Sequence, residues 1–261
     1  MEVLLPPVLP VLTVLLVTVA QRRYGHRLGG RLTGFPTTTF PFLIVLVTSD
    51  GAGAAAQAAR GMIAGQLVVA AFCLGYGRLG RRLRNPAAAV AVALGVAAGA
   101  FSIATELRSP WTAAGLTGAV VLAGLVAWPP VSGSDVAGRT PRWEMPVRVG
   151  AAAAVVTALA VLARLLGPHL AGLLSCTPVV LSILAPTTHR GSGFAAAETL
   201  VRSALRSLPA TLAFAVVTAL CVVPLGPWVA FGLAGAALFA TDQLVGRLLA
   251  ARQPVVAGQP R

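Results

Sequence analysis

The chain has 261 residues, of which 57% are hydrophobic and only 10% are charged, and its formal net charge is +13. About a quarter of the residues of a typical soluble domain are charged, so this composition is that of a polytopic membrane protein. The net charge does not predict a nucleic-acid partner, because the basic residues stand in short clusters between apolar runs. Alternating strands of the outer-membrane-barrel kind are missing, so the spans are expected to be helices.

Apolar runs recur along the chain that are long enough to cross a bilayer core of about 30 Å, which takes roughly 20 helical residues. The first run precedes its arginines, Arg22 and Arg23, which is the reverse of a signal peptide, and is interpreted as a retained helix. The nine predicted spans are 3–20, 33–49, 53–77, 86–104, 112–128, 147–166, 170–188, 200–222 and 226–246. A linker rich in Pro, Gly and Ser at 129–146 separates the fifth span from the sixth.

Arginine placement predicts the topology of these spans. With the N-terminus outside and the C-terminus cytoplasmic, 17 of the 20 basic residues fall on the cytoplasmic side. The other side then holds Arg60, Arg108 and Arg164. The localisation expected is therefore the cell (inner) membrane, with the lipid bilayer as the surrounding partner.

An internal repeat is found when the sequence is shifted by 142 residues. The identical pairs are Gly25/Gly167, Leu28/Leu170, Gly30/Gly172, Leu32/Leu174, Pro36/Pro178, Gly51/Gly193, Ala54/Ala196, Ala55/Ala197 and Arg60/Arg202. The same shift places the first four spans on the last four, so that corresponding spans are five spans apart. Because five is odd, corresponding spans cross the membrane in opposite directions. The sequence therefore predicts two inverted four-helix repeats, at 1–104 and 147–261, joined by a spacer helix and linker at 105–146. Secondary transporters commonly have this architecture.

Short motifs recur in both halves. The first half contains Gly30, Leu32, Phe35, Pro36, Gly51 and Ala55, and the second Gly172, Leu174, Pro178, Gly193 and Ala197, with Thr177 in place of the Phe. In these motifs each half resembles the small four-helix membrane proteins of the GlpM-like group. The activity of that group is not settled, so the resemblance implies no activity for this chain. The resemblance implies a tandem duplication covering residues 3–104 and 147–246. In architecture alone, two antiparallel four-helix units are also similar to small multidrug exporters and their fused drug/metabolite-transporter relatives.

Residue types that carry catalysis are sparse. The sequence has no zinc-ligand spacing, no phosphate-binding loop and no nucleophile elbow, so no enzyme activity, cofactor or metal is expected. The three histidines stand at predicted span ends, and the three cysteines are interpreted as packing residues. They are His26, His169, His189, Cys73, Cys176 and Cys221.

The polar stretch GRLTGFPTTTFP and its counterpart in the second half are the first candidate site. Each contains prolines that remove a helix donor, and the predicted helix-breaking residues are Pro36, Pro41, Pro178 and Pro186. Nearby hydroxyls can bind the carbonyls that are freed, or line a polar cavity between two broken helices. The candidate substrate-binding hydroxyls are Thr37, Thr38, Thr39, Ser175 and Thr177. A kinked helix whose hydroxyls bond to their own backbone is the alternative.

Arg60 and Arg202 are the second candidate site. Arg60 is expected about 12 Å into its span, where a charge faces a cavity or a partner, or extends to the headgroups. Glu198 stands four residues before Arg202 and can pair with it on one helix face, whereas Ala56 occupies the corresponding place before Arg60. An unpaired arginine favours an anionic substrate. Gly95 and Gly99 are expected to form a close helix-packing face.

These patterns lead to two functional hypotheses. The first is a secondary transporter or flippase for a small solute or lipid headgroup, with alternating access at the repeat interface. The second is a non-transporting accessory or scaffold subunit of an envelope enzyme or transport complex. A water-accessible cavity between spans 2, 3, 7 and 8 would favour the first, and a solid apolar interior the second.

Overall fold

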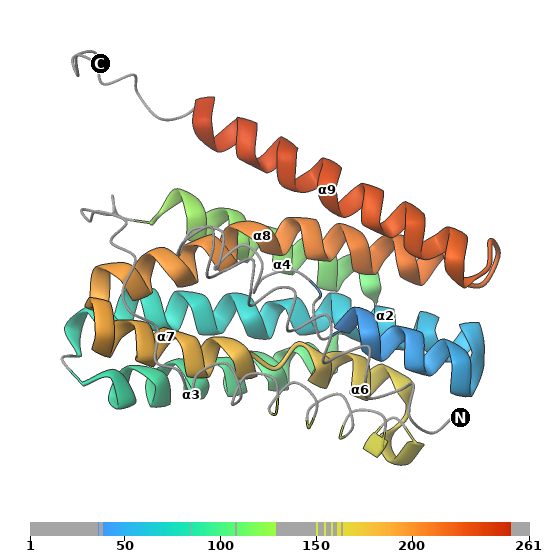
Figure 1. The fold of residues 1–261 in the computed structure, drawn as a ribbon, viewed down its shortest axis with the longest axis horizontal. Helices are drawn as coiled ribbons and strands as arrows, with labels where there is room; N and C mark the ends of the chain where they lie inside the picture. The colour runs from blue at the N-terminus through green and yellow to red at the C-terminus, as the bar shows by residue number, and fades with distance from the viewer. Residues whose placement is uncertain are drawn as a thin grey trace.

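The computed structural model describes residues 36, 39–83, 85–107, 109–128, 150, 154, 158, 161, 162 and 164–251. This part of the chain is helical throughout and contains no strand (Figure 1). Its elements are α2 (Thr39–Leu79), the 3-10 turn η1 (Gly80–Arg82), α3 (Pro86–Glu106), α4 (Pro110–Val126), α6 (Pro168–Ser175), α7 (Val179–Ser192), α8 (Phe194–Cys221) and α9 (Pro227–Ala251).

Five described helical segments are long and apolar enough to cross a membrane. They are Thr39–Arg82, Pro86–Glu106, Pro168–Ser192, Phe194–Cys221 and Pro227–Leu249, and α4 is a shorter apolar helix. The expectation of an all-helical, multi-pass membrane protein is confirmed. The full count of nine spans stays a prediction, because the expected span 3–20 and most of 147–166 lie outside the described residues.

Proline and capping residues define several helix starts. Asn85 Oδ1 accepts a hydrogen bond from the Ala87 amide at 2.9 Å, and Pro86 begins α3. Ser109 precedes Pro110 at the start of α4 in the same way. A proline fits the first turn because that turn lacks intrahelical partners for its amides. These local signals explain why the predicted spans 86–104 and 112–128 agree with α3 and α4 to within two residues.

The helix α2 changes direction at Gly51, which has φ 85° and ψ 175°. Its first part (39–50) runs toward one end of the molecule, and its second part (52–79) runs back, as the blue-to-cyan colouring shows (Figure 1). Two expected spans, 33–49 and 53–77, are therefore one helical element with a single-residue turn. Only glycine adopts this backbone conformation without strain.

Gly193 joins α7 to α8 with nearly the same geometry, φ 84° and ψ 170°. It lies 142 positions after Gly51, and α8 begins and ends 142 positions after the second part of α2. The two long helices run in opposite directions in Figure 1, α8 from left to right and the cyan part of α2 from right to left. Residues at this spacing, such as Phe72 and Phe214, are buried in both helices.

The second part of α2 is the centre of the bundle, and it contacts α3, α4, α6 and α8. Its closest approach is to α6, where a Cβ added at Gly61 would lie 1.9 Å from the His169 carbonyl oxygen. A Cβ added at Gly172 would likewise lie 2.0 Å from the Ala58 carbonyl oxygen. Missing side chains on both helices thus allow the backbones to touch.

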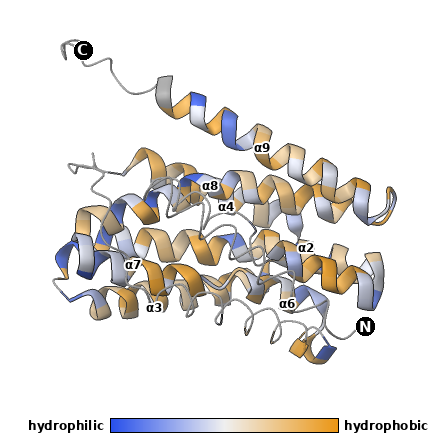
Figure 2. Ribbon diagram, viewed as in Figure 1, coloured by the Kyte–Doolittle hydropathy of each residue, from blue (hydrophilic) through white to orange (hydrophobic). Residues whose placement is uncertain are grey.

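The helix α3 packs on α2 through alanines rather than through its glycines. The buried stripe is Ala89, Ala93, Ala97, Ala100 and Ala104. Gly95 and Gly99 are exposed, and an added Cβ at either would meet no atom within 4 Å. The expected packing face at Gly95 and Gly99 is wrong for the described part of the chain, because those residues lie on the outward face. Apolar residues cover the helix exteriors, and hydrophilic ones gather where α7 meets α8 (Figure 2).

Candidate functional site

One backbone hydrogen bond is common to the described parts of the two proline segments. The Phe40 amide donates to the Pro36 carbonyl at 2.8 Å, and the Ser182 amide donates to the Pro178 carbonyl at 2.8 Å. In the second half α6 ends at Ser175 and α7 begins at Val179, so the helix is broken next to Pro178.

The other two prolines named as helix breakers do not end a helix. Pro41 lies in the first turn of α2, where the amide that it lacks would have no intrahelical partner. Pro186 lies inside α7, which continues to Ser192. Beside it, the Thr187 hydroxyl donates to the carbonyls of Ile183 and Leu184, at 2.8 and 3.0 Å. Such hydroxyl bonds help a helix to continue past a proline in an apolar setting.

The hydroxyls of the second segment bond to their own backbone. Ser175 Oγ donates to the Gly172 carbonyl at 2.5 Å, and Thr177 Oγ1 donates to the Leu174 carbonyl at 2.6 Å. Ser182 Oγ donates to Val179 in the same manner. This corresponds to the alternative of a kinked helix. In the first segment, Thr39 is buried and its Oγ1 has no hydrogen-bond partner among the described residues. Thr37 and Thr38 lie outside the described part.

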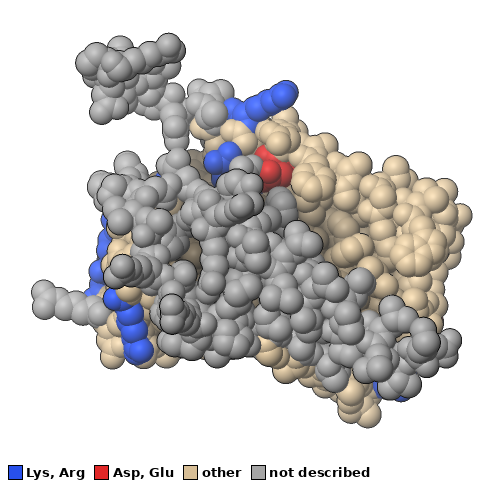
Figure 3. Space-filling view, viewed as in Figure 1, with Lys and Arg blue, Asp and Glu red and all other residues tan. Residues whose placement is uncertain are grey.

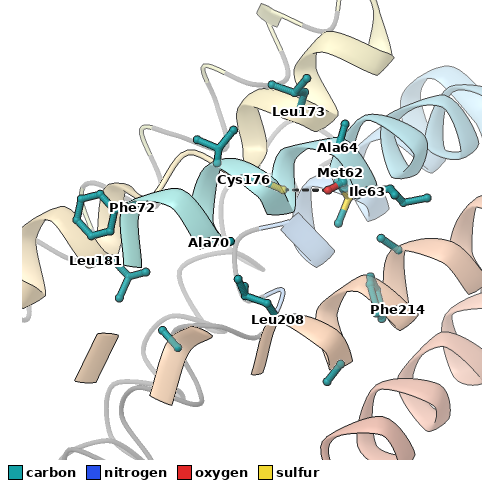
Figure 4. Close-up of a cluster of buried hydrophobic side chains, with 14 of the residues drawn as sticks. Met62, Ile63, Ala64, Ala70, Phe72, Leu173, Cys176, Leu181, Leu208 and Phe214 are labelled. Atoms are coloured by element: carbon teal, nitrogen blue, oxygen red, sulfur yellow. Dashed lines mark hydrogen bonds between the residues drawn. The ribbon is translucent and has the colours of Figure 1, made fainter. Parts of the chain in front are cut away.

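Buried apolar side chains fill the space around the break in the second half (Figure 4). Cys176 lies directly after α6 and points to α2, where its Sγ donates to the Met62 carbonyl at 3.6 Å (Figure 4). Gln66 Nε2 donates to the same Sγ at 3.5 Å. Cys176 thus has a packing role, as expected, and Gln66 supplies the one buried amide at this contact.

Arg60 and Arg202 have different surroundings. Arg60 is exposed and lines a cavity of about 140 Å³ with Trp111 and Leu220. Arg202 is half-buried on α8 and forms no ion pair within the described part of the chain. The two residues are each the ninth of matching helical segments, which begin at 52 and 194.

Glu198 forms an ion pair with Arg81, which the spacing of residues in the sequence did not predict. The Arg81 guanidinium donates to both carboxylate oxygens, at 3.1 and 3.2 Å, and Trp128 Nε1 donates to Oε1 at 3.2 Å. Glu198 is 3% exposed, whereas the Arg81 side chain is half-exposed. The expected Glu198–Arg202 pairing is therefore replaced by a contact between η1, directly after α2, and the start of α8.

Glycine and arginine residues of α2 hold Trp128 in place beside Glu198. A Cβ added at Gly77 would lie 2.2 Å from the Trp128 ring, so the indole packs directly against this glycine. Arg78 donates to the Ala127 carbonyl at 3.3 Å. We call Arg81, Trp128 and Glu198, with Gly77 and Arg78, the end cluster. Figure 3 shows basic side chains at the same end of the molecule, where α2 ends and α8 begins.

A second polar contact adjoins the end cluster. Tyr76 Oη and His189 Nδ1 lie 3.2 Å apart, and the His189 ring packs edge-on against Phe194 at a centroid distance of 5.3 Å. His189 was expected only as a residue at a span end. The signal that could have found both contacts is the antiparallel packing of α2 against α8, which brings the end of α2, the residues after it and the end of α7 to the same end of the molecule.

The described residues contain no group of three or more His, Cys, Asp or Glu side chains that could hold a metal ion. Two of the polar contacts described above join separate helices at one end of the molecule: the Arg81–Glu198 ion pair with the Trp128 indole, and the Tyr76–His189 contact. These contacts can hold helices together, and they would separate if the helices moved apart.

No protein-family model, no curated protein and no solved structure matches the chain.

Proposed function

We propose that the protein is a secondary transporter or flippase that works by alternating access between two inverted four-helix repeats, 1–104 and 147–261. The observation that supports this most is the recurrence of one turn geometry, at Gly51 and Gly193, between helices that run in opposite directions. Repeats of this kind allow one bundle to rock against the other around a site at their interface.

The depth of the two helix breaks agrees with such a site. The first part of α2 (39–50) and α7 (179–192) extend about 18 and 21 Å from their glycine turns at 1.5 Å per residue. Half of a bilayer core is about 15 Å, so both helices begin close to the midplane. Helix N-termini at this depth carry partial positive charge, which suits an anionic group of a small solute or of a lipid headgroup.

The contacts of the end cluster would have to break during transport. Arg81 belongs to the first repeat and Glu198 to the second, so separating the repeats at this end breaks their ion pair. Arginines crowd this end, and it is therefore proposed to be the cytoplasmic one. Under this proposal, the structure corresponds to a state in which the repeats are joined on their cytoplasmic side.

A non-transporting accessory subunit is the second candidate function, and the packed interior favours it. Met62, Leu173 and Leu181 are buried between α2, α6 and α7 (Figure 4). An accessory subunit would keep this packing, whereas a transporter would admit water to it in part of its cycle.

Thiol labelling at the first break distinguishes these two functions. Thr39→Cys is placed in a variant whose three native cysteines are replaced by alanine, and a membrane-impermeant maleimide is added to either face of sealed vesicles. A transporter is expected to label from both faces, and an accessory subunit from neither. Asp50→Cys and Arg82→Cys, both exposed, are the single-face controls.

Transport itself is tested in liposomes. Translocation of fluorescent phosphatidylglycerol, read by dithionite quenching, and uptake of radiolabelled phosphate cover the lipid and the solute case. Absence of both activities, together with no labelling of Thr39→Cys, would reject the transporter proposal.

A further inference from the structure

A groove runs between α4 and α8 on the side of the bundle. It has a volume of about 260 Å³, and its described lining includes Thr117, Gly118 and Val121 of α4 with Leu208, Pro209 and Leu212 of α8. Pro209 and Gly118 make room for it, because neither carries a side chain that bridges the two helices. The lining is apolar except for the buried Thr117.

The groove continues to a charged end. Val216 of α8 lines both this groove and the cavity of about 140 Å³ that Arg60 borders. That second cavity is closed by Pro110 and Trp111, the first residues of α4, and by Leu220 near the end of α8. The two cavities thus adjoin at Val216, and we call them together the path. It has a single cationic side chain at one end, and no acidic residue is among its described lining.

The dimensions of this path agree with one leaflet of a bilayer. Residues 208–220 of α8 extend about 18 Å, against about 15 Å for half of a bilayer core. Arg60 lies about 12 Å from the start of its helical segment, within reach of the headgroup region for a long side chain. Trp111 and Trp228 are exposed at this same end, as aromatic residues at a membrane interface are.

We propose that the α4–α8 groove binds an anionic phospholipid, with one acyl chain along α8 and the headgroup phosphate at Arg60. The positive charge of Arg60 complements the negative charge of the headgroup phosphate, which favours this ligand over others. A hydrophilic solute would leave an apolar groove unfilled, and a cationic amphiphile would be repelled by Arg60. The charged end of this site borders the repeat interface, because Arg60 belongs to the first repeat and Val216 and Leu220 to the second. Lipid binding does not require transport, so the proposal stands whether or not the protein transports.

The test measures lipid retained by the purified full chain, by native mass spectrometry, after exposure to dioleoyl-phosphatidylglycerol or dioleoyl-phosphatidylcholine. The two probes have the same chains and differ in net charge. Wild type is expected to retain the anionic lipid roughly fivefold better, the effect of one arginine near the membrane surface. Equal retention of both lipids would overturn the proposal.

Two variants separate the headgroup contact from the chain contact. Arg60→Gln is expected to remove the preference for phosphatidylglycerol, and Arg60→Lys to keep it. Gly118→Leu is expected to lower retention of both lipids, because its side chain enters the groove from a position where an added Cβ meets nothing within 4 Å. An unchanged preference in Arg60→Gln, or unchanged retention in Gly118→Leu, would contradict the assignment.

Matched controls keep the result interpretable. Arg164→Gln removes another exposed arginine, and Gly115→Leu adds the same side chain on the outward face of α4. Both are expected to behave as wild type. Excess inorganic phosphate is expected not to displace the lipid. Displacement by phosphate alone would show that the site recognises a free anion and would overturn the role of the acyl chain.

Discussion

Glu198 illustrates how one carboxylate can join three parts of a membrane protein. It lies in the first turns of α8, yet its partners are Arg81 in η1 and Trp128 after α4. The N-terminus of a helix stabilises a nearby negative charge, and the Arg81 guanidinium stabilises the Glu198 carboxylate further. The contact depends on both partners remaining in place, because a buried acceptor or donor without a partner is costly.

Replacing this carboxylate should therefore weaken the fold. Glu198→Ala is expected to lower stability by about 1–3 kcal/mol, since it leaves Trp128 Nε1 without an acceptor and Arg81 without a counter-ion. The measurement is the melting temperature in detergent, with tryptophan fluorescence as a second readout. Glu106→Ala, at an exposed position at the end of α3, serves as control. Equal melting temperatures for the two variants would contradict this role.

The two glycine turns give a paired prediction. Gly51→Ala and Gly193→Ala should each cost about 1–3 kcal/mol, because an alanine is strained at φ near +85° whatever space surrounds it. Both losses should be similar, since the dihedral angles nearly coincide. Gly53→Ala, in open space at ordinary φ, is the control. Losses of very different size would mean that the turns are not equivalent in the native protein. Unfolding titrations measure each of them.

At the scale of elements, the contact between α2 and α6 depends on missing side chains. Gly61→Ala and Gly172→Ala would each push a methyl group into backbone atoms of the facing helix. Backbone cannot move aside as a flexible side chain can, so a loss of about 1–3 kcal/mol is expected for each variant. Gly95→Ala and Gly99→Ala, on the outward face of α3, should show no loss. Thermal melting of all four variants checks this.

Three helix starts at a proline were predictable from the sequence, whereas α8 begins six residues before the predicted 200, and the side-chain contacts were not predicted. Pro86, Pro110 and Pro227 mark starts that depend on local backbone chemistry, which a single segment carries by itself. The partner of Glu198 lies 117 residues away, so no local spacing contains it. The glycine pattern at 95 and 99 was misassigned for a related reason. Small residues four apart show that a face can pack closely, but not which face of the helix is inside.

The candidate site shows the same division. Of the two prolines predicted to break the helix in the second half, Pro178 stands at the break, and Pro186 lies inside the continuous helix α7. Whether a hydroxyl there turns to its own carbonyl or to a cavity depends on the neighbouring helix. Ser175 and Thr177 turn to the backbone, and Thr39 is buried without a partner in the described part.

At the scale of the whole molecule, the arginine distribution predicts orientation. If the end cluster is cytoplasmic, Asp50→Cys in a cysteine-free background should react with an impermeant maleimide in intact cells. Arg82→Cys should react only after permeabilisation, because positively charged loops are retained inside. The reverse pattern would place the arginine-rich end outside and reject the proposed topology.

The distance along the chain between Arg81 and Glu198 also sets an order of events during synthesis. At about 5–20 residues per second, a ribosome needs about 6 to 23 s to make the 117 residues that separate them. During that interval the first half is in the membrane while its arginine faces water and phospholipid headgroups. The ion pair can therefore form only late in biogenesis, after Glu198 has been made. A chain lacking Glu198 is therefore expected to insert its early helices normally and to differ from wild type only after α8 has been made.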